Sequence, residues 1–314
     1  MKIINVVCGI DDKYYQHCAV MLVSLIKSTN RKFNIYILSL NVNENHKSLL
    51  REMIISLGSE VQILDVSSDW VQQFPIRRRD YLSLATYLRL FIPQLLPPEI
   101  DKVLYVDSDI VFNGDISELY DVDLSNYSLA GIEDAPNLHP LRLSYNEADS
   151  YFNAGLILLN LEYLRGIDFT NLAQKYIREN FAKIRLHDQD VLNALLHGTV
   201  LFLDIKWNML DCFFFNPPLI ASKYMEDLAK NRETPIVIHY SGPLKPWHKG
   251  CRHPMKNIYF HYANMISWSN KRVSYFFVFK KFKFIIALFI LCGDTPEKAK
   301  YKYKRFKSLF KITP

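Results

Sequence analysis

The stretch VLYVDSDIVF, residues 103–112, is an apolar, β-branched run that contains two carboxylates, Asp107 and Asp109. Its composition predicts a buried strand. Side chains alternate between the two faces of a strand, so residues two apart point the same way. Two like charges on one face beside a core repel each other and lose solvation. We therefore expect another group to compensate these two charges.

Strand-like and helix-like segments alternate on both sides of this run. Helical spacing of apolar residues is found from Ala19 to Ile26 and from Leu49 to Leu57, and residues 86–96 are also expected to be helical. The other expected strands are residues 4–8, 34–38, 61–66, 128–132 and 155–161. Strands separated by helices predict a mainly parallel, doubly wound α/β sheet. Ligands of such sheets bind beyond the carboxyl ends of the strands, where Asp11 and Asp107 are expected.

The composition of the 314 residues is that of an ordinary globular protein, with 49% hydrophobic and 22% charged residues. One large domain is the leading expectation. The start, MKIINVVCGIDD, reaches two acidic residues too early for a secretory signal, so it is expected to form the first strand. The five cysteines are scattered without metal-ligand spacing. This pattern favours neither a disulfide framework nor a zinc site, and it fits a reduced, cytosolic setting.

The charge of the chain is divided unevenly between a body and a tail. Residues 270–314 contain twelve Lys or Arg and two acidic residues, a net of +10, which leaves −4 for residues 1–269. In the tail, aromatic residues alternate with lysines, and the uninterrupted apolar run at 284–292 is too short for a spanning helix of about 20 residues. Such a tail is expected to bind an anionic membrane surface. The alternative is a packed helix with a disordered basic end, and no nucleic acid is expected as a partner.

The Asp-x-Asp pattern occurs three times, at 107–109, 121–123 and 188–190, whereas roughly one occurrence is expected by chance. A solvated turn explains the second triplet, and a helix N-terminus explains the third. Only Asp107 and Asp109 end a strand that should be central. Hard oxygen ligands suit Mg²⁺ or Mn²⁺, so a divalent cation would remove the like-charge penalty. A strand-end turn without a metal is the alternative.

The segment IVIHYSGPLKPWHKG, residues 236–250, carries a second signal. An apolar strand ends at His239, and an imidazole beside two carboxylates can complete a metal site and favours Mn²⁺ over Mg²⁺. Gly242 lets the backbone approach a ligand closely. Lys245, which precedes a proline, offers a positive charge for a phosphate. A Pro-rich turn is the alternative, and it would need neither His239 nor Lys245.

Six motifs follow one another along the chain. They are DD-x-Y-Y (11–15), Y-x-R-L (87–90), D-K-V-L-Y-x-D-x-D (101–109), F-N-A-G-x-x-L-x-N-L (152–161), D-Q-D-x-L-N (188–193) and H-Y-x-G-P-x-K-P-W-H (239–248). Over roughly residues 1–250 this series resembles the family 8 glycosyltransferases, retaining enzymes that include bacterial lipopolysaccharide galactosyl- and glucosyltransferases and glycogenin. The resemblance implies a GT-A fold, which is a Rossmann-like doubly wound mixed sheet, for residues 1–269. It also implies a UDP-hexose donor and Mn²⁺, with Mg²⁺ as the alternative ion.

The resemblance also implies roles for individual residues. The metal ligands would be Asp107, Asp109 and His239. The residues that would hold the donor are Gly9, Asp11, Tyr14, Arg89, Asp107, Ser108, Ala154, Gly242 and Lys245. The residues that would surround the reacting sugar are Asp134, Asn153, Asp188 and Gln189. The alternative interpretations are a surface ion pair for Arg89, a core position for Tyr14, a turn cap for Asn153 and a solvated loop acid for Asp134.

The resulting hypothesis is a retaining enzyme that moves galactose or glucose from UDP-hexose to a glycan acceptor and forms an α-glycosidic bond. Gln189 is a poor nucleophile, so a front-face displacement is expected rather than a covalent intermediate. The basic tail suggests a lipid-linked acceptor, such as lipopolysaccharide or another envelope saccharide, at the cytoplasmic face of the membrane. Tyr81 stands where some relatives carry a His that faces the acceptor, so the acceptor is expected to differ. The alternatives are a nucleotidyltransferase and an inactive sugar-nucleotide-binding or scaffold protein.

Overall fold

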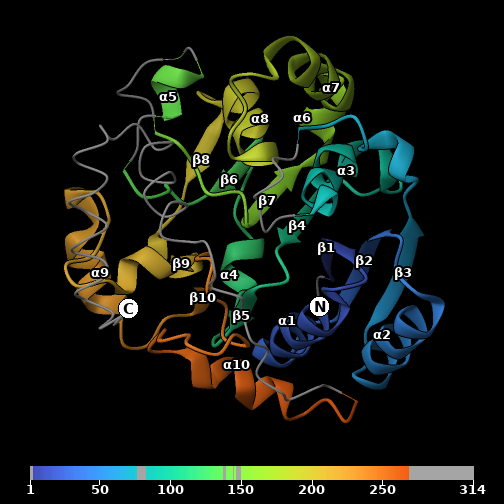
Figure 1. Ribbon diagram of the computed structural model, residues 1–314, viewed down its shortest axis with the longest axis vertical. Helices are drawn as coiled ribbons and strands as arrows, with labels where there is room; N and C mark the ends of the chain where they lie inside the picture. The colour runs from blue at the N-terminus through green and yellow to red at the C-terminus, as the bar shows by residue number, and fades with distance from the viewer. Residues whose placement is uncertain (1–2, 76–82, 137–138, 144, 146–149, 269–314) are drawn as a thin grey trace.

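The computed structural model describes residues 3–75, 83–136, 139–143, 145 and 150–268 (Figure 1). The predicted membrane-binding tail and Tyr81 lie outside the described residues. The predicted boundary between body and tail, at residues 269 and 270, also lies outside them and stays a prediction. In the described ranges, no helix is both long and apolar enough to cross a bilayer.

A seven-stranded sheet forms the centre of the protein, with the strand order β3-β2-β1-β4-β7-β6-β8. Its strands are β1 (Ile4–Asp11), β2 (Phe33–Leu40), β3 (Glu60–Asp65), β4 (Lys102–Val106), β6 (Leu129–Gly131), β7 (Leu156–Asn160) and β8 (Val200–Phe202). Neighbours are parallel except that β7 runs antiparallel to both β4 and β6. The predicted mainly parallel α/β sheet is therefore confirmed, and β7 is what makes it mixed.

A smaller sheet has the order β5-β10-β9. Its strands are β5 (Ile110–Phe112), β10 (Val237–His239) and β9 (Met209–Leu210). β10 pairs antiparallel with β5 and parallel with β9. The pairing places His239 opposite Ile110 on one side and Leu210 on the other. The end of β10 is thereby fixed next to the residues that precede β5.

Helices cover both faces of the large sheet (Figure 1). The α-helices are α1 (Tyr15–Ser28), α2 (Glu44–Ser56), α3 (Ile92–Leu95), α4 (Ser117–Tyr120), α5 (His139–Arg142), α6 (Leu161–Gly166), α7 (Phe169–Asn180), α8 (His187–Leu196), α9 (Met225–Asn231) and α10 (Lys256–Ala263). The 3₁₀ helices are η1 (Ser68–Trp70), η2 (Leu84–Phe91), η3 (Ile205–Trp207), η4 (Asp211–Phe214) and η5 (Ser222–Tyr224). α1, α2 and α10 lie on one side of the sheet, and α3, α6, α7 and α8 lie on the other.

The core is divided by the sheet into two halves, as the alternation of side chains along the strands requires. In β4, Leu104 and Val106 join the half that contains α1, whereas Val103 and Tyr105 join the half that contains η2, α7 and α8. A strand buried on both faces has a continuous apolar sequence, which is why these strands were recognisable.

The strand expected to end at Asp107 is confirmed as β4, but the apolar run at residues 103–112 as a whole is not one strand. β4 ends at Val106, residues 107–109 form a turn, and β5 begins at Ile110 in the smaller sheet. The Ile110 N–H donates to the Asp107 carbonyl at 3.3 Å. Both strands are buried, so the apolar composition continues across the turn and hides it. The same-face argument for Asp107 and Asp109 therefore does not apply, because the turn sets how they lie.

The helix expected at residues 86–96 is also different from the prediction. The segment forms the 3₁₀ helix η2, followed by the single turn α3. Pro93 has no N–H to donate to the carbonyl of Arg89, so a regular α-helix cannot run through this position. The Ser83 hydroxyl accepts the Ala85 N–H at the start of η2.

Candidate active site

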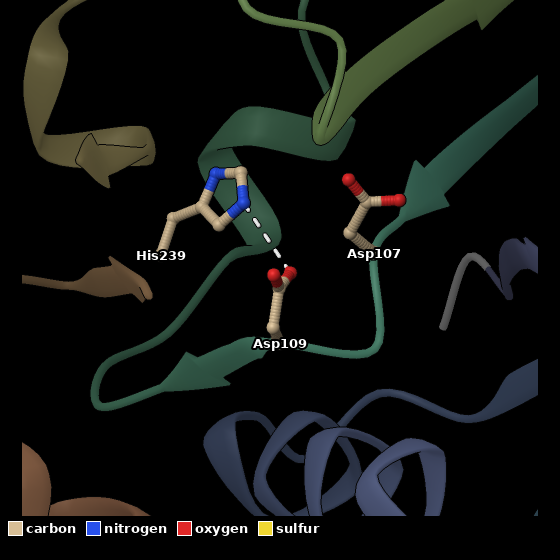
Figure 2. Close-up of side chains that lie close together, drawn as sticks. All are labelled: Asp107, Asp109 and His239. Atoms are coloured by element: carbon tan, nitrogen blue, oxygen red, sulfur yellow. Dashed lines mark ion pairs between the residues drawn. The ribbon is translucent and has the colours of Figure 1, made fainter. Parts of the chain in front are cut away.

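Two carboxylates and an imidazole lie together at the carboxyl edge of the sheet (Figure 2). Asp107 and Asp109 come from the β4–β5 turn, and His239 comes from the end of β10. One ligand atom of each residue lies within 4.8 Å of the others. The Tyr240 N–H donates to the Asp109 carbonyl at 3.0 Å, so the two chain segments are fixed to each other beside the cluster.

The cluster fits a divalent cation by three observations. No donor in the described part of the chain hydrogen-bonds to the buried Oδ1 of Asp109, and His239 Nε2 lies 3.3 Å from it. A buried carboxylate oxygen without a partner is costly unless something else binds it. A Cβ at Gly155 would lie 2.2 Å from His239 Cε1 and 3.0 Å from Asp107 Oδ2, so only glycine leaves room here. Two carboxylates with one imidazole suit Mn²⁺.

Two buried cations neutralise part of the charge of this cluster. Arg89 Nη2 lies 2.8 Å from Asp107 Oδ1, and Arg89 Nε lies 2.7 Å from Asp188 Oδ2. Lys245 Nζ lies 2.5 Å from Asp109 Oδ2. The Tyr105 hydroxyl also donates to Asp107 Oδ1 at 2.7 Å. Each carboxylate of the turn thus has its own cationic partner.

These contacts shift the pKa values of the charged groups. Burial raises the pKa of Asp107, and the nearby Arg89 opposes this. Burial would also raise the pKa of Asp109, but Lys245 and His239 outweigh it and hold that pKa well below the usual value. Burial by itself would lower the pKa of Arg89, yet Asp107 and Asp188 raise it instead. Arg89 and Asp109 are therefore charged at neutral pH.

The first of two neighbouring cavities contains most of the residues predicted to hold the donor. Its lining includes Gly9, Asp11, Tyr14, Arg89, Asp107, Ser108, Asp109 and Lys245. A Cβ at Gly9 would meet the Ala85 carbonyl at 3.2 Å, so a small residue is favoured at this wall. Tyr14 is partly buried and makes an edge contact with Trp247, with ring centroids 6.2 Å apart. Their roles toward a donor stay predictions.

The second cavity contains the four residues predicted to surround the sugar, which are Asp134, Asn153, Asp188 and Gln189. Gln189 Nε2 donates to Asp134 Oδ2 at 2.9 Å, and Gln189 Oε1 accepts the Ala154 N–H at 2.9 Å. Both ends of the amide are therefore fixed. Burial raises the pKa of Asp134, although the hydrogen bonds that it accepts oppose this.

The third Asp-x-Asp triplet has two different functions. Asp188 faces the cavity and pairs with Arg89. Asp190 is fully buried and accepts from Arg142 Nη2 at 2.7 Å, from the Tyr151 hydroxyl at 2.8 Å, and from two backbone N–H groups. Asp190 therefore anchors the start of α8, whereas Asp188 is available at the cavity. The interpretation of both residues as helix N-terminal acids was incomplete.

Two predicted donor residues, Ala154 and Gly242, do not line either cavity. Ala154 contributes only backbone, since its carbonyl accepts from Arg89 and its N–H donates to Gln189. The Gly242 N–H donates to Asp211 Oδ2 at 3.1 Å, and a Cβ at this glycine would lie 2.1 Å from that oxygen. Gly242 therefore makes room for a carboxylate of the protein, and its contact with the donor stays a prediction.

The structure also tests the alternative roles considered for Arg89, Asn153 and Asp134. A surface ion pair is wrong for Arg89, whose side chain is 4% exposed. The turn-cap interpretation of Asn153 is correct in part, because its Oδ1 accepts the Gly155 N–H at 3.0 Å while the residue also lines the second cavity. Asp134 is half-buried and accepts hydrogen bonds from two side-chain amides, so it is not a solvated loop acid.

Three residues of the site were not predicted from the sequence. Gly155 lies inside the motif F-N-A-G and could have been found there. Asp211 directly follows the short strand β9, so the strand-end rule could have indicated it. Asn208 is fully buried beside His239, with its Oδ1 3.0 Å from His239 Nδ1. Its sequence context, KWNML, contains nothing that indicates this contact.

Comparison with known proteins places the chain in a family. Residues 5–251 match the model of glycosyl transferase family 8. A putative glycosyltransferase of Haemophilus influenzae is 32% identical over 79% of this chain and 74% of its own length. General stress protein A of Bacillus subtilis is 29% identical over 85% of this chain and 96% of its own length. A lipopolysaccharide 1,2-glucosyltransferase of Escherichia coli K12 is 29% identical over 82% of this chain and 76% of its own length.

Solved structures show the same fold. The galactosyltransferase LgtC, in complex with donor and acceptor sugar analogues, superposes with a TM-score of 0.77 at 24% identity, covering 84% of this chain and 96% of that one. This likeness confirms the expected GT-A fold. Because the family model spans most of the chain and the described site contains the motifs that suggested it, the protein belongs to glycosyltransferase family 8.

Proposed function

We propose that the protein is a metal-dependent, retaining hexosyltransferase that moves galactose or glucose from a UDP-hexose to a glycan acceptor and forms an α-glycosidic bond. The observation that carries the proposal is the position of the Asp107–Asp109–His239 cluster. It lies between a cavity with the expected nucleoside residues and a cavity with the expected sugar residues, and both cavities share Asp107, Asp109, Arg89 and Lys245. A diphosphate joins a nucleoside to a sugar, so its place in a bound donor corresponds to this shared region.

The charged residues of this region suit a diphosphate. Arg89 and Lys245 are buried cations at the boundary of the two cavities, where their positive charges can attract a phosphate. Asp107, Asp109 and His239 would hold a divalent cation, with Mn²⁺ favoured over Mg²⁺ by the imidazole. When bound, such a cation supplies Lewis-acid stabilisation of the departing UDP.

The residues around the sugar favour a front-face reaction. Gln189 stands in the second cavity with both ends of its amide hydrogen-bonded, so it can orient a sugar and stabilise positive charge at C1 but is a poor nucleophile. In the proposed step the C1–O bond to the phosphate breaks, and the acceptor oxygen forms a bond to C1 on the same face. The acceptor hydroxyl gives its proton to the departing phosphate. Asp188, held by Arg89, and Asp134, held by Gln189, keep the pocket in shape.

The acceptor is proposed to be an envelope saccharide. Several relatives are lipopolysaccharide transferases by name, including a 1,2-glucosyltransferase of Escherichia coli and a 1,3-galactosyltransferase of Salmonella typhimurium. The basic tail at residues 270–314, with its net charge of +10, supports a lipid-linked acceptor reached from the cytoplasmic face of the membrane. Each basic residue near an anionic surface contributes about 1 kcal/mol to binding.

The alternative is an inactive protein that only binds a sugar nucleotide or acts as a scaffold. An inactive member of the family would be expected to have lost some of the residues that bind the metal, the phosphate or the sugar. Here Asp107, Asp109, His239, Lys245 and Gln189 all lie at the two cavities. Membership of a glycosyltransferase family leaves no support for a nucleotidyltransferase.

The proposal is tested by incubating the full-length protein with a panel of UDP-sugars and a saccharide acceptor, with Mn²⁺ or with EDTA. We expect transfer from UDP-galactose or UDP-glucose only in the presence of the metal. NMR of the product should show an α-linked sugar. A β-linked product would refute the retaining mechanism, and equal turnover in EDTA would refute the metal requirement. Binding of UDP without any turnover across the panel would favour the inactive alternative.

A further inference from the structure

Asn208 lies between η3 and β9 and has 0% of its surface exposed. The parallel pairing of β9 with β10 brings it beside His239. Its Oδ1 lies 3.0 Å from His239 Nδ1, and its Nδ2 donates to Asn153 Oδ1 at 3.0 Å. A fully buried amide whose oxygen and nitrogen both form hydrogen bonds with side chains of the site has a defined orientation.

The direction of these hydrogen bonds follows from a backbone group whose chemistry is fixed. The Gly155 N–H can only donate, and it points at the same Asn153 oxygen at 3.0 Å. The Asn153 atom in this position must therefore be the carbonyl oxygen, and the Asn208 atom that contacts it must be the amide nitrogen. The other end of Asn208 is then an acceptor, so His239 Nδ1 must carry a hydrogen.

We propose that Asn208 is a positioning residue that holds His239 in the Nδ1–H tautomer and presents the Nε2 lone pair to the space between Asp107 and Asp109. A neutral imidazole binds a metal through the nitrogen that has no hydrogen, and a partner on the other nitrogen fixes the tautomer and ring orientation. The inference rests on the metal site of the proposed function. The hydrogen-bond direction behind it comes from the protein alone.

The same contacts extend to the sugar cavity. Asn153 Nδ2 donates to Asp134 Oδ2 at 3.5 Å, and Gln189 Nε2 donates to the same oxygen at 2.9 Å. His239, Asn208, Asn153, Asp134 and Gln189 thus form one continuous chain of hydrogen bonds between the metal ligand and the proposed reactive face. Asn208 contacts His239 directly and reaches the sugar pocket only through Asn153, so its loss should affect the metal site before it affects the sugar pocket.

The first experiment determines the tautomer without metal or substrate. Long-range ¹H–¹⁵N spectra of the metal-free, full-length protein at alkaline pH distinguish the two tautomers, and the His239 signals are identified by their loss in His239→Gln. We expect Nδ1–H in the wild type. Asn208→Ala should lose this preference, and Asn208→Asp, which keeps an acceptor for Nδ1–H, should retain it.

The opposite result has a structural basis, since an Nε2–H could donate to Asp109 Oδ1 at 3.3 Å. An Nε2–H tautomer in the wild type, or an unchanged Nδ1–H tautomer in Asn208→Ala, would overturn the inference. If Asn208→Ala lacks cooperative unfolding, Asn208→Asp decides the question, because loss of Nδ1–H in that variant contradicts the role assigned to the acceptor.

The second experiment measures Mn²⁺ affinity from the loss of the free-ion EPR signal. Asn208→Ala should bind Mn²⁺ about tenfold or more weakly, the usual effect of removing such a partner, and Asn208→Asp should stay close to the wild type. Asn160→Ala is the matched control, because the Asn160 side chain makes three hydrogen bonds at the opposite end of β7. Equal affinity in Asn208→Ala and wild type would refute the inference. If the wild type shows the expected tautomer but no Mn²⁺ binding, the metal assignment of the proposed function fails instead.

Discussion

The replacement of Asp211 by Asn should stabilise the protein at neutral pH. Asp211 Oδ2 accepts the Gly242 N–H at 3.1 Å, but in the described part of the chain nothing hydrogen-bonds to Oδ1. His253 Nε2 lies 3.4 Å from that oxygen and is also unpaired there. Burial raises the pKa of Asp211 to about 6 and lowers the pKa of His253 to about 4. At neutral pH the protein therefore holds a buried carboxylate whose charge is poorly compensated.

The sign and size of the effect follow from linkage. The ordinary pKa of 3.8 applies to the unfolded chain, so the folded protein binds this proton more tightly. Stability then falls as the pH rises from about 4 to about 6, and the full penalty remains above about 6. A pKa difference of about two corresponds to about 3 kcal/mol. An asparagine carries no charge and can still accept the Gly242 N–H through its side-chain oxygen.

The assay is urea unfolding of the wild type and Asp211→Asn in EDTA at pH 4 and pH 7.5. We expect the free energy of unfolding of the variant to exceed that of the wild type by about 3 kcal/mol at pH 7.5, and the two to be nearly equal at pH 4. Asp123→Asn serves as a control, because Asp123 lies on the surface and its pKa is lowered by hydrogen bonds from Ser125. An equal difference at both pH values, or a less stable Asp211→Asn at pH 7.5, would refute the reasoning.

Four further predictions concern the site and the tail. His239→Ala and Asp109→Ala should each abolish transfer and weaken Mn²⁺-dependent UDP binding at least tenfold while the far-ultraviolet circular dichroism is unchanged; full activity in either variant would remove it from the ligand set. Gly155→Ala should have the same effect through the 2.2 Å approach of its Cβ to His239, and wild-type Mn²⁺ affinity would contradict this steric argument. Gln189→Ala should lower kcat at least a hundredfold with little change in UDP affinity, whereas near wild-type turnover would exclude it from the reactive face. Deletion of residues 271–314 should abolish salt-sensitive sedimentation with anionic vesicles and preserve metal-dependent UDP-hexose hydrolysis; a full-length protein that stays in the supernatant at low salt would show that the tail is not an anchor.

The sheet could be predicted because its strands are buried on both faces and are separated by amphipathic helices. Continuous apolar runs such as residues 34–38 and 155–161 correspond to β2 and β7. The reversal of β7 could not be predicted, since a strand buried on both faces has the same composition in either direction. The entry of residues 110–112 into a second sheet could not be predicted either, because the apolar composition is the same on both sides of the turn at residues 107–109.

The site was predicted where a motif or a strand end marks it, and missed where tertiary contacts alone create it. Asp107, Asp109 and His239 follow apolar strands, so the strand-end rule brings them to one edge. Asn208 functions through the pairing of β9 with β10, two strands of two and three residues. Strands this short have no detectable periodicity. The pairing that brings Asn208 beside His239 therefore could not be predicted from the local sequence.

The charge count of the cluster explains why the two carboxylates of the β4–β5 turn are tolerated in a buried setting. Asp107, Asp109 and Asp188 are paired with only two cations, Arg89 and Lys245, through contacts of 2.5 to 2.8 Å. Arg89 contacts two of the carboxylates, so one negative charge remains without a partner of its own. In the described part of the chain, the Oδ1 of Asp109, 3.3 Å from His239 Nε2, also accepts no hydrogen bond. Arg89 and Lys245 therefore compensate part of the repulsion, and the remaining negative charge would favour the proposed cation beside the imidazole of His239.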